Sequence, residues 1–279
     1  MCKLRRKMML LLFVLFLLTG CLFVNSLLDA HRIEQINDQA QELVNIPAQP
    51  TPAAATPSMP LPKKLTETAE SVPEKPLDTY AALLKKSDLS ALQTVNPDVI
   101  GWILVPDTAI NYPLLHTQNN STYLHTAWDG TENQAGSIFL ETRNNPALSD
   151  FNTILYGHHM RNGSMFAALL DYQDPAFSEN HSAVYILTEE GIYQYTIFAA
   201  YEASIVSDTY RLTFQDDAQK QAAITSYLQR SQWESPLDVT TNDHILTLST
   251  CTGTGQYETR WVVQAVRTYF WANKKAGSP

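Results

Sequence analysis

The segment HILTLSTCTGTGQYETRWVVQAVR, at residues 244–267, constrains the fold more than any other part of the chain. Apolar and polar side chains alternate over 245–250, which predicts a β-strand that ends at Cys251. A loop with two glycines follows, and residues 259–268 are rich in β-branched and aromatic side chains, so they predict a second strand. If the two strands pair as a hairpin, Cys251 and Arg260 lie at the same end of it. A thiol facing a guanidinium is a candidate reactive centre, because a nearby cation favours the thiolate.

The start of the chain predicts export. Residues 8–28 carry no charged side chain and match the ~20 residues that a bilayer-spanning helix needs. Residues 1–7 are basic, which predicts a cytoplasmic N-terminus with the rest of the chain outside. Two alternatives stay open: a cleaved signal peptide, and lipidation of Cys21, whose LTGC context at 18–21 resembles a bacterial lipobox. Because apolar residues continue to Leu28, we favour an uncleaved signal anchor, and all three alternatives export the domain.

Residues 29–79 are predicted to form a stalk outside the membrane. Apolar positions in 29–46 recur at helical spacing, and eight of the fifteen prolines lie in 47–76. Such a proline-rich run cannot form a helix and has little to bury, which indicates an extended spacer. It would hold a domain at 80–271 away from the membrane, and 272–279 would form a C-terminal tail.

The net charge of −9 belongs to the domain, because residues 1–79 contain as many acidic as basic side chains. An acidic domain of about 200 residues can bury a sizeable core but is ill suited to bind nucleic acid, so we expect no nucleic-acid partner. Cys251 is the domain's single cysteine, which excludes an internal disulfide. Neither a zinc-type Cys/His spacing nor a calcium-type acidic loop occurs in the sequence, so we expect no metal and no cofactor.

Short apolar runs bounded by turn residues recur along the domain and predict a mainly β fold. The remaining strands are expected at 101–105, 110–115, 137–140, 153–156, 183–188 and 192–201, and helices at 77–86, 89–94, 164–172 and 213–229. Ser164 is the expected N-cap of the third helix, and Thr213 and Asp216 stand in capping-box positions at the start of the fourth. About eight short strands with few helices favour one antiparallel barrel over a parallel sheet.

Two of the seven histidines stand out as partners for the thiol. His158 and His159 directly follow an apolar strand in NTILYGHHM. Neighbouring side chains on an extended chain point in opposite directions, so at most one of them can face Cys251, and the pattern does not choose between them. A solvated or structural role is the default for the others: His31, His116, His125, His181 and His244. Nothing in the spacing selects an acid as the third member of a triad.

The residues then resemble a known family. TLSTC at 247–251, followed by Arg260 on the next strand, resembles the signature of the sortases, which are membrane-anchored cysteine transpeptidases of Gram-positive bacteria. ILYGHHM at 154–160 resembles their histidine motif, in which the histidine directly after glycine is catalytic. NPDVIGWILVPDTAINYPLL and GSIFLE resemble the class B sortases in particular. The resemblance covers roughly 80–270 and implies one eight-stranded β-barrel, with short N-terminal helices and a helix inserted before the last two strands.

The resemblance also implies roles for individual residues. Cys251 would be the nucleophile, His158 the general acid and base, and Arg260 the group that positions the substrate or stabilises the oxyanion. Ser249 is a weaker candidate for a substrate contact. Some class B members carry an acid two residues after the cysteine, where this chain has Gly253, so the role of that acid does not transfer.

The implied reaction is a transpeptidation. The enzyme would cleave a C-terminal sorting motif of a surface protein after threonine, through a cysteine thioester, and pass the protein to an amine of cell-wall peptide or of a pilin lysine. Class B resemblance suggests an NPxTx-like motif. Two alternatives stay open: an exported cysteine peptidase that hydrolyses the same type of bond, and a non-catalytic wall-binding module.

Overall fold

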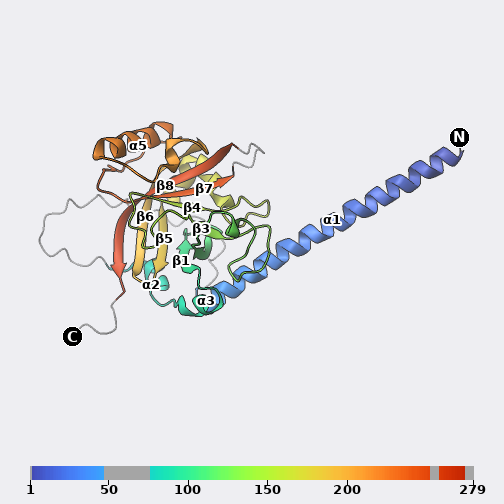
Figure 1. The fold of residues 1–279 in the computed structure, drawn as a ribbon, viewed down its shortest axis with the longest axis horizontal. Helices are drawn as coiled ribbons and strands as arrows, with labels where there is room; N and C mark the ends of the chain where they lie inside the picture. The colour runs from blue at the N-terminus through green and yellow to red at the C-terminus, as the bar shows by residue number, and fades with distance from the viewer. Residues whose placement is uncertain (1, 47–75, 252–257, 274–279) are drawn as a thin grey trace, which may run out of the picture.

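The computed structural model describes residues 2–46, 76–251 and 258–273 (Figure 1). Three sequence expectations fall outside these ranges: the proline-rich spacer at 47–75, the loop at 252–257 with its Gly253, and the tail beyond Asn273. The described part holds the whole predicted strand that ends at Cys251.

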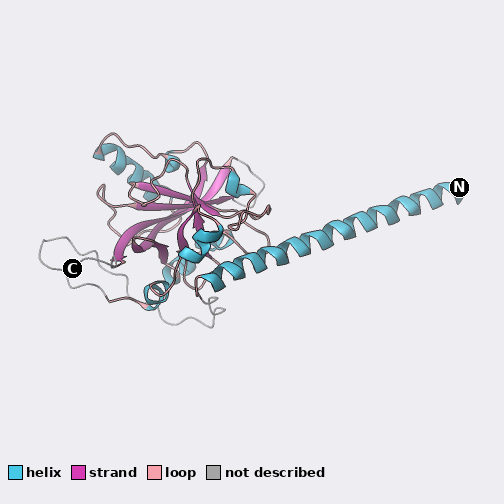
Figure 2. Ribbon diagram, turned by 60° about the horizontal axis from the view of Figure 1, so that its bottom comes forward, coloured by secondary structure: helices cyan, strands magenta, loops and turns pink. Residues whose placement is uncertain are grey.

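The described residues form a closed barrel of eight strands, which confirms the predicted fold (Figure 2). In chain order the strands are β1 (Val99–Leu104), β2 (Asn111–Leu115), β3 (Ile138–Leu140), β4 (Asn152–Tyr156), β5 (Ala183–Thr188), β6 (Gly191–Ser204), β7 (Ile245–Cys251) and β8 (Thr259–Ala272). Around the barrel they follow the order β1-β2-β3-β4-β7-β8-β6-β5. Each strand therefore has a hydrogen-bonded neighbour on both sides.

The expectation of an antiparallel barrel fails at two strand pairs, which are parallel. β2 pairs with β3 in parallel, through Leu114 beside Ile138, and β4 pairs with β7 in parallel, starting at Asn152 beside Ile245. Parallel neighbours need a long crossover connection, and both pairs have one. The first crosses over through residues 116–137, and the second takes in β5, β6 and the helix before β7.

The barrel interior is filled because alternate residues of each strand point to opposite faces. One cluster of buried side chains, which fills the interior, receives residues from one face of every strand. Its members include Ile103, Leu155, Leu248 and Val263. Trp102, next to Ile103, belongs instead to a second cluster outside the barrel. The alternation seen in the sequence thus separates the interior from the outer packing.

Helices and 3-10 turns surround this barrel. They are α1 (Cys2–Leu43), α2 (Thr79–Leu84), α3 (Ser90–Val95), η1 (Thr122–Leu124), η2 (Ala167–Gln173), α4 (Pro175–Asn180), η3 (Asp208–Tyr210) and α5 (Asp217–Arg230). α2 and α3 confirm the two short helices predicted ahead of β1. α5 confirms the helix inserted before the last two strands, and its Ala223, Ile224 and Tyr227 pack with residues of β6 and β8 such as Phe198 and Val262.

The segment predicted as an α-helix from Ser164 is instead the 3-10 helix η2, which begins at Ala167. Ser164 does not cap it. Its hydroxyl donates a hydrogen bond to Asn162 Oδ1 at 2.7 Å in the preceding turn, so it stabilises that turn rather than the helix.

Aspartate side chains set the starts of two α-helices. Asp216 is itself the N-cap of α5, because its carboxylate accepts from the Gln219 amide at 2.8 Å. The start predicted near Thr213 is therefore too early. Asp174 caps α4 in the same manner, accepting from the Ala176 amide at 2.9 Å. That six-residue helix has too few residues to show a helical period, and it was not predicted.

α1 runs as a single helix of 42 residues that extends far from the barrel, with the N-terminus at its distant end (Figure 1). Its last turns and the turn that follows them dock on the barrel through buried Ile33, Ala40 and Val44. The indole Nε1 of Trp128 donates to the Ile36 carbonyl at 2.8 Å and fixes this contact. In the part of the chain that the structure describes, no helix combines the length and the apolar character needed to cross a membrane.

Candidate active site

Three neighbouring strands bring the predicted catalytic residues to one end of the barrel. β7 lies between β4 and β8, and the last register pair of β7 with β8 is Cys251 with Arg260. β4 runs parallel to β7, and their last pair is Tyr156 with Ser249. His158 and Cys251 each follow that pair by two residues. The backbones of His158, Cys251 and Arg260 therefore meet at the same barrel end.

Close packing around Gly157 explains why a glycine precedes His158. Its amide donates to the Ser249 carbonyl at 3.3 Å, so the chain stays against β7 for one residue beyond β4. A Cβ at this position would lie 2.4 Å from Ile138 Cδ1 and 2.7 Å from Phe166 Cδ2. A larger residue would therefore require Ile138 and Phe166, or the strand end that leads to His158, to shift.

His158 is half-buried and held on two sides. Its Nε2 lies 2.8 Å from the Leu124 carbonyl oxygen, and its ring stacks on the His125 ring with centroids 6.1 Å apart. Its own carbonyl accepts from the Phe166 amide at 2.9 Å. The imidazole is therefore fixed by a segment 34 residues earlier in the chain, which no sequence pattern indicated.

The structure separates the two adjacent histidines. The backbone of His159 pairs with Met165 across the short hairpin that follows β4. Its side chain lies near Asp171, whose pKa is raised by burial and only partly lowered by the rings of His181 and His159. His158, by contrast, contacts Leu124 and His125.

Two further predicted residues lie on β7 and β8. Arg260 is half-buried, and its Nη1 donates to the Thr259 carbonyl at 2.9 Å. Ser249 is only 2% exposed, and its hydroxyl lies 2.9 Å from the Tyr210 hydroxyl of η3. A substrate contact by Ser249 stays a prediction, and in this structure the residue ties β7 to η3.

Three of the other histidines have the structural role expected of them. Each places a ring nitrogen near a backbone carbonyl: His116 at 3.3 Å from Thr142, His181 at 2.9 Å from Phe177, and His244 at 2.9 Å from Asp150. His125 differs from them. It is exposed, as a solvated histidine would be, but its ring stacks on His158. No sequence pattern indicated that neighbour.

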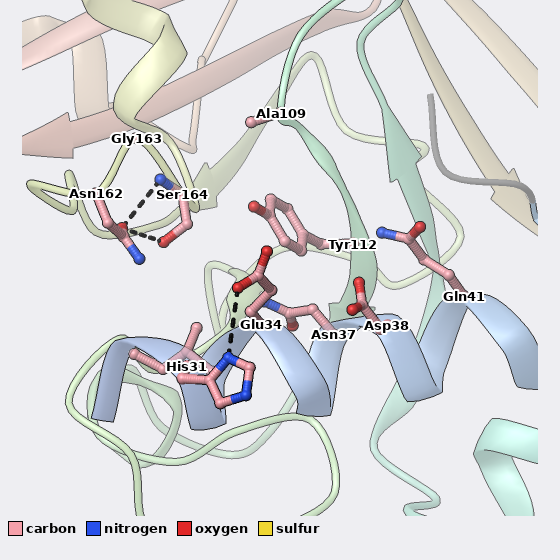
Figure 3. Close-up of a pocket in the computed structure, with 11 residues that line it drawn as sticks. His31, Glu34, Asn37, Asp38, Gln41, Ala109, Tyr112, Asn162, Gly163 and Ser164 are labelled. Atoms are coloured by element: carbon pink, nitrogen blue, oxygen red, sulfur yellow. Dashed lines mark hydrogen bonds and ion pairs between the residues drawn. The ribbon is translucent and has the colours of Figure 1, made fainter. Parts of the chain in front are cut away.

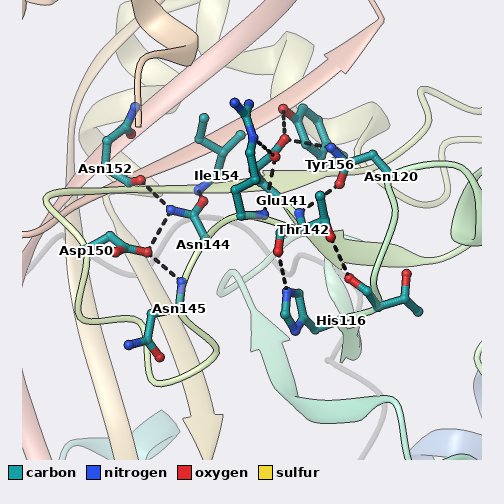
Figure 4. Close-up of polar contacts among 12 residues, drawn as sticks. His116, Asn120, Glu141, Thr142, Asn144, Asn145, Asp150, Asn152, Ile154 and Tyr156 are labelled. Atoms are coloured by element: carbon teal, nitrogen blue, oxygen red, sulfur yellow. Dashed lines mark hydrogen bonds and ion pairs between the residues drawn. The ribbon is translucent and has the colours of Figure 1, made fainter. Parts of the chain in front are cut away.

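A buried carboxylate supports the strand that leads to His158 (Figure 4). Glu141, 2% exposed, accepts from Tyr156 at 3.1 Å, from Asn120 at 2.7 Å and from Arg143 Nε at 2.8 Å. Burial opposes its ionisation, but the hydrogen bonds from Arg143, Tyr156 and Asn120 outweigh that cost and hold the pKa of Glu141 below its ordinary value. The carboxylate thus anchors Tyr156, the last residue of β4.

A pocket of about 470 Å³ lies between α1 and the turn of the hairpin that follows β4 (Figure 3). Glu34 and Asp38 face it from α1, Tyr112 from β2, and Asn162 and Ser164 from the turn. Among the residues that the structure describes, neither the imidazole nor the guanidinium of the predicted centre lines it. It adjoins the hairpin that follows His158.

The strand-end geometry suits acyl transfer. Within the described ranges, no group of three His, Cys, Asp or Glu side chains could hold a metal ion. A half-buried imidazole that can move a proton lies at the end of the strand next to the cysteine's strand, and a guanidinium stands opposite in register. A thiol, a proton carrier and a fixed cation are the groups that covalent acyl transfer needs.

Comparison with known proteins agrees with this chemistry. The family model described as the sortase domain matches residues 103–268. Sortase B of Staphylococcus aureus is 34% identical over 166 residues, which cover 60% of this chain and 68% of that protein. Sortase B of Listeria monocytogenes is 37% identical over 182 residues, covering 64% and 73%. A solved sortase B from Bacillus anthracis superposes with a TM-score of 0.66 at 27% identity, covering 87% of this chain and 99% of that one. The chain therefore belongs to the sortase family of cysteine transpeptidases, and within it is most similar to the class B sortases.

Proposed function

We propose that this sortase cleaves a C-terminal sorting motif after its threonine and transfers the new carboxyl end to an amine. The observation that carries the proposal is the meeting of three strand ends. Cys251 and Arg260 are register partners, and His158 follows β4, the other neighbour of β7. The residue types match the three roles: nucleophile, oxyanion or substrate cation, and general acid and base.

In the first half-reaction the Cys251 thiolate attacks the threonine carbonyl carbon. Arg260 stabilises the negative charge that develops on the carbonyl oxygen. His158 gives a proton to the departing amine as the C–N bond breaks, and a thioester remains. In the second half-reaction an acceptor amine attacks the thioester carbonyl, its proton passes to His158, and the C–S bond breaks to release Cys251.

The similarity to class B sortases supports an NPxTx-like sorting motif on the donor protein. The acceptor is the amine of a cell-wall peptide, and a pilin lysine is the alternative acceptor. Both present a primary amine on a flexible stem, and the proposed second half-reaction serves either.

We also propose that residues 8–28 anchor the enzyme and place the barrel outside the cell. The support is the sequence: no charge in 8–28 and a basic segment before it at 1–7. Lipidation at Cys21 and cleavage as a signal peptide are the alternatives. Mass spectrometry of the mature N-terminus distinguishes all three, because an anchor keeps residue 1, lipidation leaves an acylated Cys21, and cleavage leaves a shorter free end.

A fluorogenic peptide panel that varies the residues around Pro-x-Thr tests the function. Each peptide is incubated with and without triglycine as amine acceptor. The proposal predicts cleavage after threonine, with the product shifting to the amine adduct when triglycine is present. If the peptide is hydrolysed to the same product with and without triglycine, the result would instead support an exported cysteine peptidase. If no peptide is cleaved and a thiol-reactive mimic of the sorting peptide does not label Cys251, the result would support a non-catalytic module.

A further inference from the structure

The hydrogen bond between His158 and Leu124 determines where the histidine carries its proton. The Leu124 carbonyl oxygen lies 2.8 Å from His158 Nε2, and a carbonyl oxygen can only accept. Nε2 must therefore be the protonated nitrogen. In the neutral ring, the lone pair that can take up a proton is then on Nδ1.

We propose that the Leu124 carbonyl is the positioning group of His158, fixing the Nε2–H tautomer so that Nδ1 exchanges the catalytic proton. The inference rests on the proposed role of His158 as acid and base. Serine and cysteine enzymes commonly orient such a histidine with a third side chain. Here a backbone carbonyl takes that place, which also explains why no acid in the sequence could be selected as a third member.

The protons balance with this assignment. Nδ1 accepts the thiol proton of Cys251, so an S–H bond breaks and an N–H bond forms, and the same proton later passes to the departing amine. Nε2 keeps its proton in both the neutral and the charged ring. The bond to Leu124 therefore persists through the cycle and holds the ring in one orientation.

Gly136 fixes the carbonyl itself. Its φ of +58° lies in the left-handed region, and a Cβ there would stand 2.3 Å from the Tyr123 carbonyl oxygen and 2.8 Å from that of Leu124. The amide of Ser137 donates to the Tyr123 carbonyl at 2.9 Å. The start of β3 is thus pressed against the two carbonyls at the end of η1, and there is no room for a side chain between them.

The other end of η1 is held as firmly. Asn119 Oδ1 accepts from the amides of Ser121 and Thr122 at 2.8 Å each. The buried Tyr123 hydroxyl donates to Asp98 at 2.9 Å and accepts from Asn96 at 2.8 Å. With both ends of the turn fixed, the Leu124 oxygen is a rigid reference point for the imidazole.

Nitrogen-15 NMR of histidine-labelled protein tests the tautomer directly, and it needs no substrate. The signal of His158 is assigned by its absence in His158→Asn and recorded at a pH where the ring is neutral. The proposal predicts the Nε2–H pattern in the wild-type enzyme. An Nδ1–H pattern, or a free mixture of the two, would overturn it whether or not the enzyme is a transpeptidase.

Gly136→Ala tests the positioning, with Gly130→Ala as the matched control. Gly130 has φ +87° in the same crossover segment but nothing within 4 Å of an added Cβ, so that variant carries the backbone strain without the clash. In folded Gly136→Ala we expect loss of the pure Nε2–H pattern and a fall in thioester formation on the order of 10²-fold, with KM little changed. Gly130→Ala should keep the wild-type pattern. If both variants behave alike, the carbonyl contact is not what orients His158.

Discussion

The amide of Gly157 donates a hydrogen bond to the carbonyl of Ser249 at 3.3 Å, one residue before His158 on one strand and two before Cys251 on the next. This single contact joins the two motifs that the sequence placed about ninety residues apart. It works because β4 and β7 are parallel, so both chains leave the barrel in the same direction at the same end. The barrel topology, rather than local sequence, brings the backbones of His158 and Cys251 to the same end of the barrel.

Gly157→Ala should destabilise the protein and lower its activity. The added methyl group would lie 2.4 Å from Ile138 Cδ1, and overpacking of this kind costs about 1–3 kcal/mol. Urea unfolding measures the loss. Gly163→Ala is the control, because an added Cβ there meets nothing within 4 Å and only the positive φ is strained. Unchanged stability in Gly157→Ala would show that the barrel can relax around the methyl group.

Glu141→Gln should make the stability depend differently on pH. The native pKa of Glu141 is held below its ordinary value because the hydrogen bonds it accepts from Arg143, Tyr156 and Asn120 outweigh the opposing effect of burial. A lowered pKa stabilises the fold above the unfolded value of about 4.3, and that stabilisation disappears as the pH falls through the native value. At pH 7 the free energy of unfolding of the wild type should exceed that of Glu141→Gln by about 1–3 kcal/mol.

The same difference should shrink below about pH 4, where the unfolded carboxylate and then the native one become protonated. Urea unfolding at a series of pH values gives the curve. Glu132→Gln, which changes an exposed glutamate in the same way, should show little difference at any pH. A gap between wild type and Glu141→Gln that widens in acid would contradict the assigned direction of the shift.

Trp128→Phe should loosen the docking of α1 without disturbing the barrel. The change removes the Nε1 donor that reaches the Ile36 carbonyl at 2.8 Å but keeps a buried aromatic ring. A lost hydrogen bond of this type costs about 0.5–1.5 kcal/mol. Hydrogen exchange should therefore become faster in residues 33–46 and stay unchanged in β7 and β8. Trp233→Phe, which removes the donor to Tyr172 at 3.3 Å, should leave residues 33–46 at the wild-type rate.

Arg260→Ala should lower the rate of thioester formation by about 10²–10³-fold, the usual effect of removing one oxyanion donor. Arg260→Lys keeps the charge but not the planar fork, so it should recover part of the rate. Stopped-flow release of the leaving peptide measures both. Arg161→Ala, an exposed arginine in the hairpin after β4, is the control. A rate for Arg260→Ala equal to the control would remove Arg260 from the mechanism.

The sequence predicted most of the fold and the strand-end residues because those signals are local. Alternation marks Ile245–Cys251 as a strand, and glycine before His158 marks the end of β4. The partners of His158 have no such signal. The Leu124 carbonyl belongs to the backbone and can come from any residue type, and His125 has ordinary loop surroundings in the sequence.

Local sequence patterns also could not predict whether neighbouring strands pair in parallel or antiparallel. An apolar run such as Ile138–Leu140 has the same alternation whether its neighbour is parallel or antiparallel, and the long crossovers decide which. The first residue of α5 could not be predicted from local sequence either. Thr213 and Asp216 both suit an N-cap, and the bond to the Gln219 amide selects Asp216.

Intact-mass spectrometry of the enzyme with a sorting-motif peptide tests the central claim most directly. Wild-type enzyme should gain the mass of the peptide fragment ending in threonine, located on Cys251 by digestion and lost on adding triglycine. His158→Asn should form this adduct far more slowly, and Cys251→Ala should never form it. Peptide cleavage by Cys251→Ala at the wild-type rate, or an adduct on any other residue, would contradict the account.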